Sequence, residues 1–481
     1  MKKEEKKEIG ITADKDEFSE WFTQLMLKAD LADYSEVSGC MVFKPSSYAL
    51  WEKVIQECDK KFKKIGVKNA YFPLLIPEKF LNKEKEHVEG FSPEVAWVTQ
   101  AGDTKLSERL AVRPTSETIM YPSYSKWIRS WRDLPLKINQ WNNVVRWEFS
   151  HPVPFFRTRE FLWNELHTVL ATEKEALEEG KDILNVYDGF CNEFMALYGM
   201  AGKKTEREKF AGGVASTKLH YILQSGRVIE GPCFHYDGQN FAKAYNIKFL
   251  DEKGKEQYAY QNTYAISTRM LGAMFAIHSD DRGLILPPKM APNQIVIVPI
   301  IFEDSKKEVL REAEKISKSF EEFGAFIDSR DNYKPGFKFN EWELKGIPLR
   351  IEIGPKDIKE GTVDVTRRDN GKKEKIKIKE LVKKAPEILN DIQNSLFKKS
   401  EKIFKEKIEK TNTIQGLKKI IENKKVGIVP LCKNEKCEEM IKAETKGAKA
   451  LFIDETQEVK SEKCIICNKP AEYFIYAGKS Y

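Results

Sequence analysis

The sequence predicts an α+β fold of two or three domains, in which a mixed region of strands and helices is followed by a small α/β domain and a final C-terminal region. A chain of 481 residues is long for a single hydrophobic core. Strand-like runs separated by long amphipathic helices fill the first part. Pro287, Pro288 and Pro292 then mark a hinge, and beyond it strand and helix patterns alternate in the manner of a small α/β domain.

The first part contains four expected helices and two expected strands. The helix over 46–65 has Ser at its start and Gly66 at its end, which are common helix-boundary residues. The apolar periodicity predicts helices at 16–29, 46–65, 121–131 and 173–198, and strands at 137–149 and 257–265.

Beyond the hinge, residues 294–300 form an apolar run typical of a buried strand, 306–323 a helical pattern and 350–353 a second strand. A Lys- and Glu-rich helical stretch leads into a final region from about Thr413. We detect no internal repeat.

The net charge of +7 is unevenly distributed. Residues 368–425 contain 18 Lys or Arg and 9 Asp or Glu, a local charge of +9 that leaves about −2 for the rest. This basic stretch would hold a nucleic acid electrostatically, or its lysines simply keep helices solvated. No apolar run approaches the 18 residues of a membrane span, and MKKEEKKE is not a signal peptide. We therefore expect a cytoplasmic protein.

Four of the eight cysteines, Cys432, Cys437, Cys464 and Cys467, form a C-x4-C and a C-x2-C pair separated by 26 residues. Such pairs in a cytosolic chain predict a tetrahedral Zn²⁺ site. No histidine follows His278, so all four ligands would be thiolates and the role structural. The alternative is a set of unpaired buried thiols.

A second cluster lies between Arg113 and His167. The run Val145 to Phe149 alternates apolar and charged residues, so a strand would direct Arg146 and Glu148 to one face. A polar loop with His151, Pro152, Pro154, Arg157 and Thr158 follows, and then an apolar run over 160–170. Guanidinium groups would bind a nucleotide triphosphate, and the carboxylates Mg²⁺ or an amine. The alternative is a solvated amphipathic hairpin.

Several strings, in a fixed order, resemble those of class II aminoacyl-tRNA synthetases, and specifically prolyl-tRNA synthetases of the archaeal and eukaryotic type. FPLLIP resembles motif 1, VVRWEF through RTREFLW motif 2, and AISTRMLGAMFAIHSDDRGLILPP motif 3. RPTSET resembles the proline-binding loop, KPGFKFNEWELKGIPLRIEIGP the anticodon-binding domain and GKSY the family's C-terminus. Long strings in order are more specific than any one motif.

The resemblance implies a class II antiparallel-sheet catalytic domain, an α/β anticodon-binding domain and a small zinc-binding C-terminal α/β domain. We expect a charged extension over 1–16, the catalytic domain over 17–288, the anticodon-binding domain over 289–398 and the zinc domain over 399–481. Motif 1 implies a homodimer. The carboxylate of Tyr481 is expected to fold back toward the catalytic domain.

Proline carries a secondary ammonium on an apolar ring, so its pocket needs a carboxylate and a flat hydrophobic wall. By resemblance, Thr115 and Glu117 bind the amine, and Trp163 forms the wall. The full proline-binding set is Thr115, Glu117, Arg146, Trp163, Glu165, His167 and His235. Alternatively, Thr115 opens a helix cap, but Thr118 stands where a capping box needs Glu or Gln.

Activation requires the proline carboxylate to attack the α-phosphorus of ATP, so catalysis is mostly positioning and charge neutralisation. The resemblance assigns Arg146 to the carboxylate and α-phosphate, Arg157 and Thr158 to the triphosphate, Phe161 to adenine and Arg269 to the γ-phosphate. We expect Arg146 and Arg269 to be the catalytic pair. The expected ATP-binding set is Arg146, Glu148, Arg157, Thr158, Phe161, Glu230, Cys233, Ser267 and Arg269, with Mg²⁺ accompanying the nucleotide.

One segment departs from the family pattern. In GPCFHYDGQNF, Cys233 and Phe234 replace small hydroxyl residues, and Glu230 replaces a common glutamine. The family's contacts to the ATP ribose therefore need not hold here, whereas His235 keeps its place. We interpret Cys233 as a buried small apolar residue rather than a catalytic thiol.

For tRNA(Pro), Glu343, Arg350 and Lys356 match the family positions that read the anticodon guanines. Arg and Lys donate to guanine O6 and N7, and Glu accepts from N1 and N2 of an unpaired base. The alternative is surface charge at a strand edge.

The resemblance implies proline–tRNA ligase activity, and the spacing of the motifs predicts that an editing domain is absent. Only about a hundred residues separate Glu165 from Arg269, too few for the editing insertion of bacterial relatives, and a few missing methylenes cost only about 1–3 kcal/mol of discrimination. We therefore expect cysteine or alanine to be activated. Two alternatives remain: a synthetase for another small amino acid, or a catalytically silent synthetase-like protein that binds tRNA.

Overall fold

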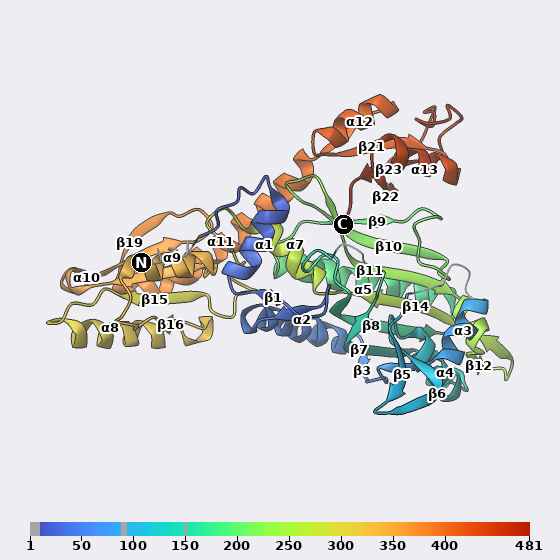
Figure 1. Cartoon of the computed structure of the whole chain (residues 1–481), viewed down its shortest axis with the longest axis horizontal. Coiled ribbons are helices and arrows are strands. Elements are labelled where there is room, and N and C mark those ends of the chain that lie inside the picture. Colours follow the sequence, from blue (N-terminus) through green and yellow to red (C-terminus); the bar gives the residue numbers. More distant parts are fainter. Residues whose placement is uncertain (1–9, 88–93, 149–151) are drawn as a thin grey trace.

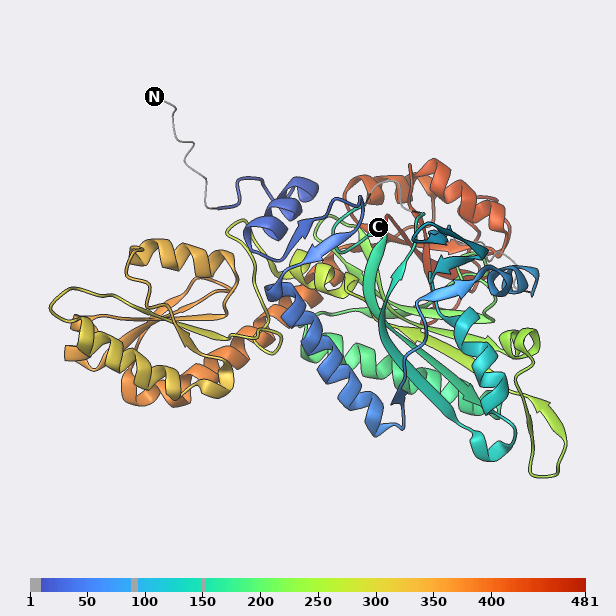
Figure 2. The same ribbon diagram turned by 60° about the horizontal axis from the view of Figure 1, so that its bottom comes forward.

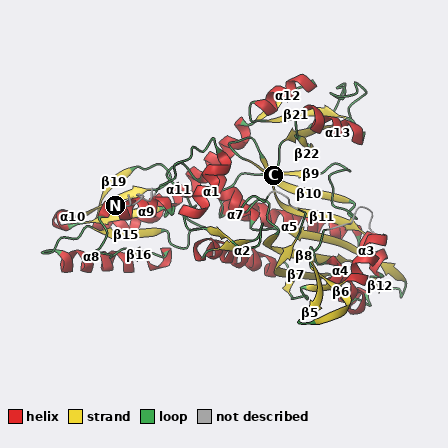
Figure 3. Cartoon of the chain, viewed as in Figure 1, coloured by secondary structure: helices red, strands yellow, loops and turns green. Residues whose placement is uncertain are grey.

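The computed structural model describes residues 10–87, 94–148 and 152–481. Its parts form an extended molecule: an α/β unit lies at one end, a large sheet with its helices at the other, and the C-terminal region lies along the β9 edge of that sheet (Figures 1 and 2). The strands gather into one dominant sheet (Figure 3). Within these residues, no helix is long and apolar enough to cross a membrane.

The dominant sheet has eleven strands in the order β20-β21-β23-β22-β9-β10-β11-β14-β8-β7-β3. Neighbours are antiparallel except the pairs β3–β7 and β20–β21. The catalytic half contains β3 (Lys68–Asn69), β7 (Leu136–Val145), β8 (Glu160–Leu170), β9 (Met200–Lys203), β10 (Ala215–Ile222), β11 (Val228–Gly238) and β14 (Tyr260–Ala265). The other four strands come from the C-terminal region: β20 (Ile408–Lys410), β21 (Val426–Leu431), β22 (Lys449–Asp454) and β23 (Tyr473–Gly478).

The junction of the two halves is the pairing of Ile453 on β22 with Lys203 on β9. At this place the ring of Phe452 lies over Gly202, and it is 4.3 Å from the ring of the buried His220, centroid to centroid. A methyl group at Gly202 would overlap Phe452. The C-terminal region therefore continues the catalytic sheet.

Helices cover one face of this sheet. Apolar side chains of α5 pack against β11 and β14, and α2 packs against α5, in the largest buried cluster. The helices of this half are α1 (Phe18–Lys28), α2 (Pro45–Lys64), α3 (Glu78–His87), α4 (Glu117–Trp127), η1 (Trp131–Asp133), α5 (Glu173–Glu193), α6 (Asn240–Tyr245) and α7 (Arg269–His278). Its smaller sheets are formed by β1 (Ala32–Tyr34) and β2 (Met41–Phe43), by β4 (Leu75–Pro77), β5 (Trp97–Ala101) and β6 (Thr104–Val112), and by β12 (Lys248–Leu250) and β13 (Glu256–Tyr258).

The α/β unit has the strand order β16-β15-β17-β18-β19, parallel at β16-β15-β17 and antiparallel beyond. Its strands are β15 (Ile295–Pro299), β16 (Phe326–Ile327), β17 (Leu349–Ile353), β18 (Thr362–Arg367) and β19 (Lys373–Lys377). Its helices are α8 (Lys306–Lys318), η2 (Glu321–Phe323), α9 (Pro335–Leu344) and α10 (Pro355–Glu360). The long helix α11 (Ile378–Glu406) leads to the C-terminal region, which adds α12 (Ile414–Glu422) and α13 (Glu435–Glu444).

The fold class and most expected elements are confirmed. The helix expected over 121–131 lies earlier, at Glu117–Trp127, because the turn formed by the RPTSET loop leads directly into it. The helix over 306–323 is interrupted after Lys318, where a 3₁₀ turn completes it.

The strand expected over 137–149 ends at Val145, so the prediction that Arg146 and Glu148 share a strand face is wrong. The backbone N–H of Arg146 donates to Arg159 O at 2.7 Å, while that of Trp147 donates to Glu94 O at 3.1 Å. The chain therefore leaves the β7–β8 ladder and turns. Phe149 and His151 lie outside the described residues.

Candidate active site

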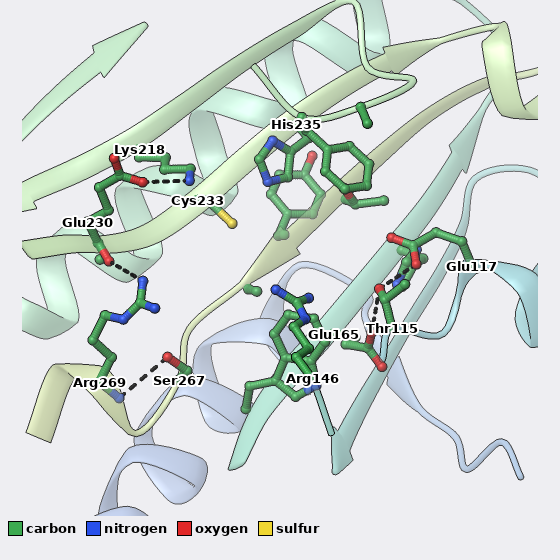
Figure 4. Close-up of a pocket in the computed structure, with 18 of the residues that line it drawn as sticks. Thr115, Glu117, Arg146, Glu165, Lys218, Glu230, Cys233, His235, Ser267 and Arg269 are labelled. Carbon is green, nitrogen blue, oxygen red and sulfur yellow. Dashed lines mark hydrogen bonds and ion pairs between the residues drawn. The ribbon is translucent and has the colours of Figure 1, made fainter. Parts of the chain in front are cut away.

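A cavity of about 380 Å³ opens on the sheet face opposite α5 (Figure 4). Alternate residues of β8 and β11 face it, because successive side chains of a strand point to opposite sides. The walls come from β8, β10, β11 and β14, from the RPTSET loop, from residues 208–211 and from the start of α7. The lining includes Thr115, Glu117, Arg146, Phe161, Trp163, Glu165, His167, Glu208, Lys209, Phe210, Lys218, Glu230, Cys233, His235, Thr263, Ser267 and Arg269.

One end of the cavity is acidic. The Thr115 hydroxyl donates to the Glu117 carboxylate and lies 3.2 Å from Glu165 Oε1. Glu165 also accepts from the Ser116 backbone N–H at 2.9 Å and from Asn142 Nδ2 at 2.8 Å. Both carboxylates are at least 97% buried. Two fixed, buried carboxylates form a site for an ammonium group.

Two histidines flank this acidic end. The His167 ring bonds through Nδ1 to the Tyr121 hydroxyl at 3.0 Å. His235 bonds through Nδ1 to the Ser216 hydroxyl at 2.7 Å, and its ring lies 4.7 Å from that of Phe210. Burial, with Lys218 and Arg146 nearby, lowers the pKa of His235 to about 3. His235 is therefore neutral near pH 7 and adds no charge to the pocket.

Arg146 lies in the middle of the cavity (Figure 4). Its Nε donates to Pro114 O at 3.0 Å, and its guanidinium lies 5.5 Å from the Phe161 ring and 5.2 Å from the Trp163 ring. The turn after β7 and these cation–π contacts orient the guanidinium. Arg146 therefore lies where it can contact a ligand that extends from the acidic end to the far wall.

Arg269 forms the basic far end, as the first residue of α7. Its Nε donates to Phe156 O at 3.0 Å, and NH1 donates to Glu230 O at 3.2 Å. Burial lowers the pKa of Arg269 from its usual value, although a guanidinium stays charged at any physiological pH. Ser267 lies beside it and accepts from the Arg269 backbone N–H at 3.4 Å.

Glu230 also lines this end, but lysines surround its carboxylate. Lys204 and Lys449 lie 3.0 Å from Oε1, and Lys218 lies 2.8 Å from Oε2. Burial by itself would raise the pKa of Glu230, but these lysines hold it well below its usual value. Glu230 is thus a neutralised carboxylate.

The GPCFHYDGQNF segment divides between the two faces of β11. Cys233 faces the cavity, and burial raises the pKa of its thiol, so it remains protonated at neutral pH. Phe234 points the other way, stacks on Tyr264 at 5.3 Å between ring centroids and lies beneath Gly180 of α5. Of the two residues that replace hydroxyls, only Cys233 is positioned to contact a ligand.

The structure brings together every expected proline-binding residue, together with Phe161, Glu230, Cys233, Ser267 and Arg269. The other three expected ATP residues lie outside the cavity lining: Glu148 and Arg157 are exposed, and Thr158 is buried. Arg157 is still close enough to lower the pKa of Arg269. Five further residues line the cavity without any motif to predict them: Glu208, Lys209, Phe210, Lys218 and Thr263. The Gly212–Gly213 pair beside the first three is the one sequence feature that could indicate them.

In the α/β unit, Glu343 and Arg350 line one shallow hollow with Trp342, Arg367 and Arg368. Arg350 pairs with Glu352 at 2.9 Å, and Glu343 pairs with Arg282 at 2.8 Å. Lys356 lies outside this lining, on α10, with an 84% exposed side chain.

The four cysteines of the two pairs converge from three places: Cys432 follows β21, Cys437 lies in the first turn of α13, and Cys464 and Cys467 lie on the loop between β22 and β23. Their sulfur atoms lie within 4.8 Å of one another, and Cys432 Sγ is 3.6 Å from Cys437 Sγ and 3.7 Å from Cys467 Sγ. Four thiolates at about 2.3 Å from a tetrahedral zinc ion would be about 3.8 Å apart. The donor set and the spacing therefore fit Zn²⁺.

The last residue lies against the catalytic half. The Tyr481 ring stacks on Phe156 at 4.7 Å and lies 5.9 Å from Phe18, measured between centroids. The guanidinium of Arg227 covers it at 4.9 Å. Phe156 also accepts the hydrogen bond from Arg269, so the C-terminus packs directly behind the basic end of the cavity.

Three family models match the chain. The class II core domain of synthetases for G, H, P, S and T matches residues 97–278, an anticodon binding domain matches 294–388, and the C-terminal domain of prolyl-tRNA synthetases matches 414–481.

Whole-chain relatives agree with these models. The chain is 44% identical over 493 residues to the cytoplasmic proline–tRNA ligase of Arabidopsis thaliana, covering 100% of this chain and 93% of the relative. It is 44% identical over 460 residues to the proline–tRNA ligase of Natranaerobius thermophilus, covering 95% and 94%. A crystal structure of the prolyl-tRNA synthetase of Cryptosporidium parvum, complexed with halofuginone and AMPPNP, superposes with a TM-score of 0.94 at 44% identity, covering 98% of this chain and 100% of that one.

Proposed function

This chain belongs to the class II prolyl-tRNA synthetases of the eukaryotic and archaeal type and is a proline–tRNA ligase, and we propose that its cavity catalyses both steps of that reaction. L-Proline and ATP first form prolyl-adenylate and pyrophosphate. The adenylate then passes proline to a ribose hydroxyl at the 3′ end of tRNA(Pro). The observation that carries this assignment is a single cavity with two carboxylates at one end and Arg269 at the other, and Arg146 between them.

At the acidic end, Glu117 and Thr115 bind the secondary ammonium of proline. Trp163 supplies the flat wall for the ring, and Glu165, His167 and His235 shape the floor. This division is supported by the hydrogen bonds of Thr115 to Glu117 and Glu165. A neutral His235 adds no positive charge to compete with the ammonium for these carboxylates.

Arg146 holds the proline carboxylate beside the α-phosphate, within reach of both ends. A carboxylate oxygen attacks the α-phosphorus, the bond to the bridging oxygen breaks, and pyrophosphate leaves with that electron pair. No base is needed, because the nucleophile is already an anion. Positioning and charge neutralisation supply the acceleration.

Arg269 and Arg157 neutralise the phosphate chain, Thr158 hydrogen-bonds it, and Phe161 stacks on adenine. Ser267, Cys233 and Glu230 complete the nucleotide site. Mg²⁺ would accompany the phosphates, and Glu148, on the turn after β7, is a candidate contact for it or for adenine. AMPPNP in the Cryptosporidium parvum relative supports a nucleotide at a site of this fold.

The α/β unit would bind the anticodon. Glu343 and Arg350 share one hollow, and Lys356 on the neighbouring α10 could contact the same strand of RNA. The basic stretch over 368–425, which includes α11, would hold the phosphate backbone.

Zinc in the Cys432, Cys437, Cys464 and Cys467 site would be structural. Four thiolate ligands fill a tetrahedral shell and leave no position for a substrate. Cys432, Cys437 and Cys464 pack in one buried cluster with Ala448 and Ala450, so the ion would stabilise the strand that joins the catalytic sheet.

We also propose a cytoplasmic homodimer formed through motif 1. The segment 72–77 ends in the short strand β4. Leu75, the first residue of β4, is 36% exposed, and Tyr71, just before the segment, is 72% exposed. Exposed apolar groups beside a strand favour an interface.

The chain would not edit its own errors. Residues 166–268 consist of β8 to β14 with α5 and α6, which leaves no separate folded insertion in that stretch. A pocket shaped for proline excludes alanine or cysteine only weakly, so both should be activated measurably.

The test is proline-dependent exchange of labelled pyrophosphate into ATP, with cysteine and alanine in parallel. Exchange with proline, lost in Arg146→Ala, supports the proposed adenylation site. Absence of exchange in folded, zinc-replete protein would favour a catalytically silent tRNA-binding protein instead. Undetectable exchange with both cysteine and alanine would contradict the proposed lack of selectivity.

A further inference from the structure

The charged residues that line the cavity carry no net positive charge to attract ATP. Apart from the histidines, its charged lining residues are four carboxylates, Glu117, Glu165, Glu208 and Glu230, and four basic groups, Arg146, Lys209, Lys218 and Arg269. A nucleotide triphosphate is strongly anionic even with Mg²⁺ bound. Two of the carboxylates, Glu208 and Glu230, lie at the nucleotide end, where they would repel it.

One side chain from the C-terminal region pairs with both of these carboxylates. Lys449 is the first residue of β22. Its Nζ lies 3.0 Å from Glu230 Oε1 and 3.0 Å from Glu208 Oε2. Lys449 is not part of the cavity lining, so it acts on the nucleotide end only through these two carboxylates.

The same region anchors the segment that carries Glu208. Lys204 Nζ donates to the Leu451 carbonyl at 2.6 Å, and the Thr205 hydroxyl donates to Glu438 at 3.0 Å. Arg207 pairs with Glu439 at 3.2 Å. Together with the Lys449–Glu208 pair, these contacts fix the chain that leads into the Lys209 to Ala211 wall of the cavity.

Lys449 remains a cation in this setting. Burial alone would lower its pKa, but Glu230 and Glu208 raise it above the usual value for lysine. Lys204, which is 99% buried, has a pKa lowered to about 8 by burial. Of these two lysines, Lys449 therefore keeps its positive charge to a higher pH than Lys204 does.

We propose that Lys449 is a positioning residue for ATP: it holds Glu230 and Glu208 neutralised and in place, so that the C-terminal region completes the nucleotide end of the cavity. Arg269 contacts the same residue, because its Nη1 donates to the backbone carbonyl of Glu230 at 3.2 Å. The proposal rests on the assignment of this end to ATP under the proposed function.

The experiment is pyrophosphate exchange by the full chain, with ATP and proline titrated separately. Lys449→Met keeps the aliphatic stem and removes the charge. We expect KM for ATP to rise about tenfold, as for other coupled charged contacts, with KM for proline and kcat within about twofold of the parent values. Lys442→Met is the matched control, since Lys442 is exposed on α13, and it should leave all three constants unchanged.

Two further variants separate electrostatics from structure. Lys449→Arg should keep KM for ATP close to the parent value. Adding Glu208→Gln to Lys449→Met should recover most of the lost ATP affinity, because one of the unpaired carboxylates is then gone. Zinc content should be unchanged in each folded variant, and the urea midpoint of Lys449→Met should fall, because two carboxylates lose a partner.

An unchanged KM for ATP in Lys449→Met, or an equal rise for ATP and proline, would overturn the proposal. If Lys449→Met does not fold, the single variant Glu208→Gln decides: removal of one carboxylate at the nucleotide end should lower KM for ATP, and an unchanged or raised KM would overturn the proposal. Failure of the parent protein to exchange would instead contradict the proposed function.

Discussion

Gly180 on α5 lies directly over the ring of Phe234 on β11, so closely that a methyl group at Gly180 would overlap the ring. Phe234 stands where the family has a small hydroxyl residue, and its ring is 9% exposed. The replacement of a small residue by Phe234 is therefore accommodated by packing against α5. The absent side chain at Gly180 makes room for the larger one at Phe234.

Gly180→Ala should therefore destabilise the protein, by about 1–3 kcal/mol of unfolding free energy, as overpacking does. The matched control is Gly189→Ala on the same helix, where the nearest outside atom to a new methyl is Lys61 Nζ at 3.9 Å. Because alanine favours a helix over glycine by about 1 kcal/mol, the control should be stabilised. Urea midpoints distinguish the two; equal shifts would contradict the packing argument.

Glu117→Gln should raise KM for proline about a hundredfold, the cost of removing one partner of a buried charged contact. KM for ATP should change little, because Glu117 lies at the acidic end. Steady-state pyrophosphate exchange measures both constants. The exposed Glu178 on α5, mutated to Gln, is the control. A similar rise in both constants for Glu117→Gln would mean that the pocket has collapsed.

His278 should make stability depend on pH. Burial lowers its pKa to about 3, whereas an unfolded histidine titrates near 6.5. The unfolded chain therefore binds a proton that the folded chain does not, so this contribution is present above pH 6.5 and is lost as pH falls toward 3. At pH 5.5 the loss is about 1.4 kcal/mol.

The matched variant is His278→Gln, whose amide can keep the bond to Met195 O that His278 Nε2 makes at 2.9 Å. Between pH 7.5 and 5.5, the urea unfolding free energy of the parent should fall by about 1.4 kcal/mol more than that of the variant. Equal slopes would show that His278 protonates in the folded state.

Cys437→Ser should lower the zinc content and loosen the C-terminal region. Through β22, we expect the variant to weaken ATP binding in the exchange assay as well as to lower the thermal midpoint. Cys40→Ser is the control, because Cys40 lies outside the four-cysteine cluster. Full zinc occupancy in Cys437→Ser, measured by elemental analysis, would refute the assignment of this ligand.

Arg350→Ala should separate tRNA charging from adenylation. We expect kcat/KM for tRNA(Pro) to fall about 10- to 100-fold, since one specific contact to guanine contributes about 1–3 kcal/mol, while pyrophosphate exchange stays at the parent rate. Lys359→Ala, also in the α/β unit and exposed, is the control. Loss of exchange in Arg350→Ala would point to misfolding.

Local sequence patterns determined the family, the cysteine cluster and one face of the cavity. The order of the motif strings predicted the family, which the comparisons confirm. Cysteine spacing predicted the cluster of four sulfurs, and the alternation of Phe161, Trp163, Glu165 and His167 along one strand placed all four on the cavity face. These features depend on residues close in sequence, or on a two-residue period that a strand converts directly into a face.

The tertiary structure decided the rest. The run from Val145 to Phe149 alternates like a strand, yet β7 ends at Val145. The backbone N–H of Trp147 bonds to Glu94 O, outside the β7–β8 pair, and Arg146 lines the cavity. The continuous sheet, and the pairing of Lys449 with Glu208 and Glu230 across it, join segments that are far apart in the chain. No local pattern encodes such contacts, because their stability arises only when β22 and β9 meet.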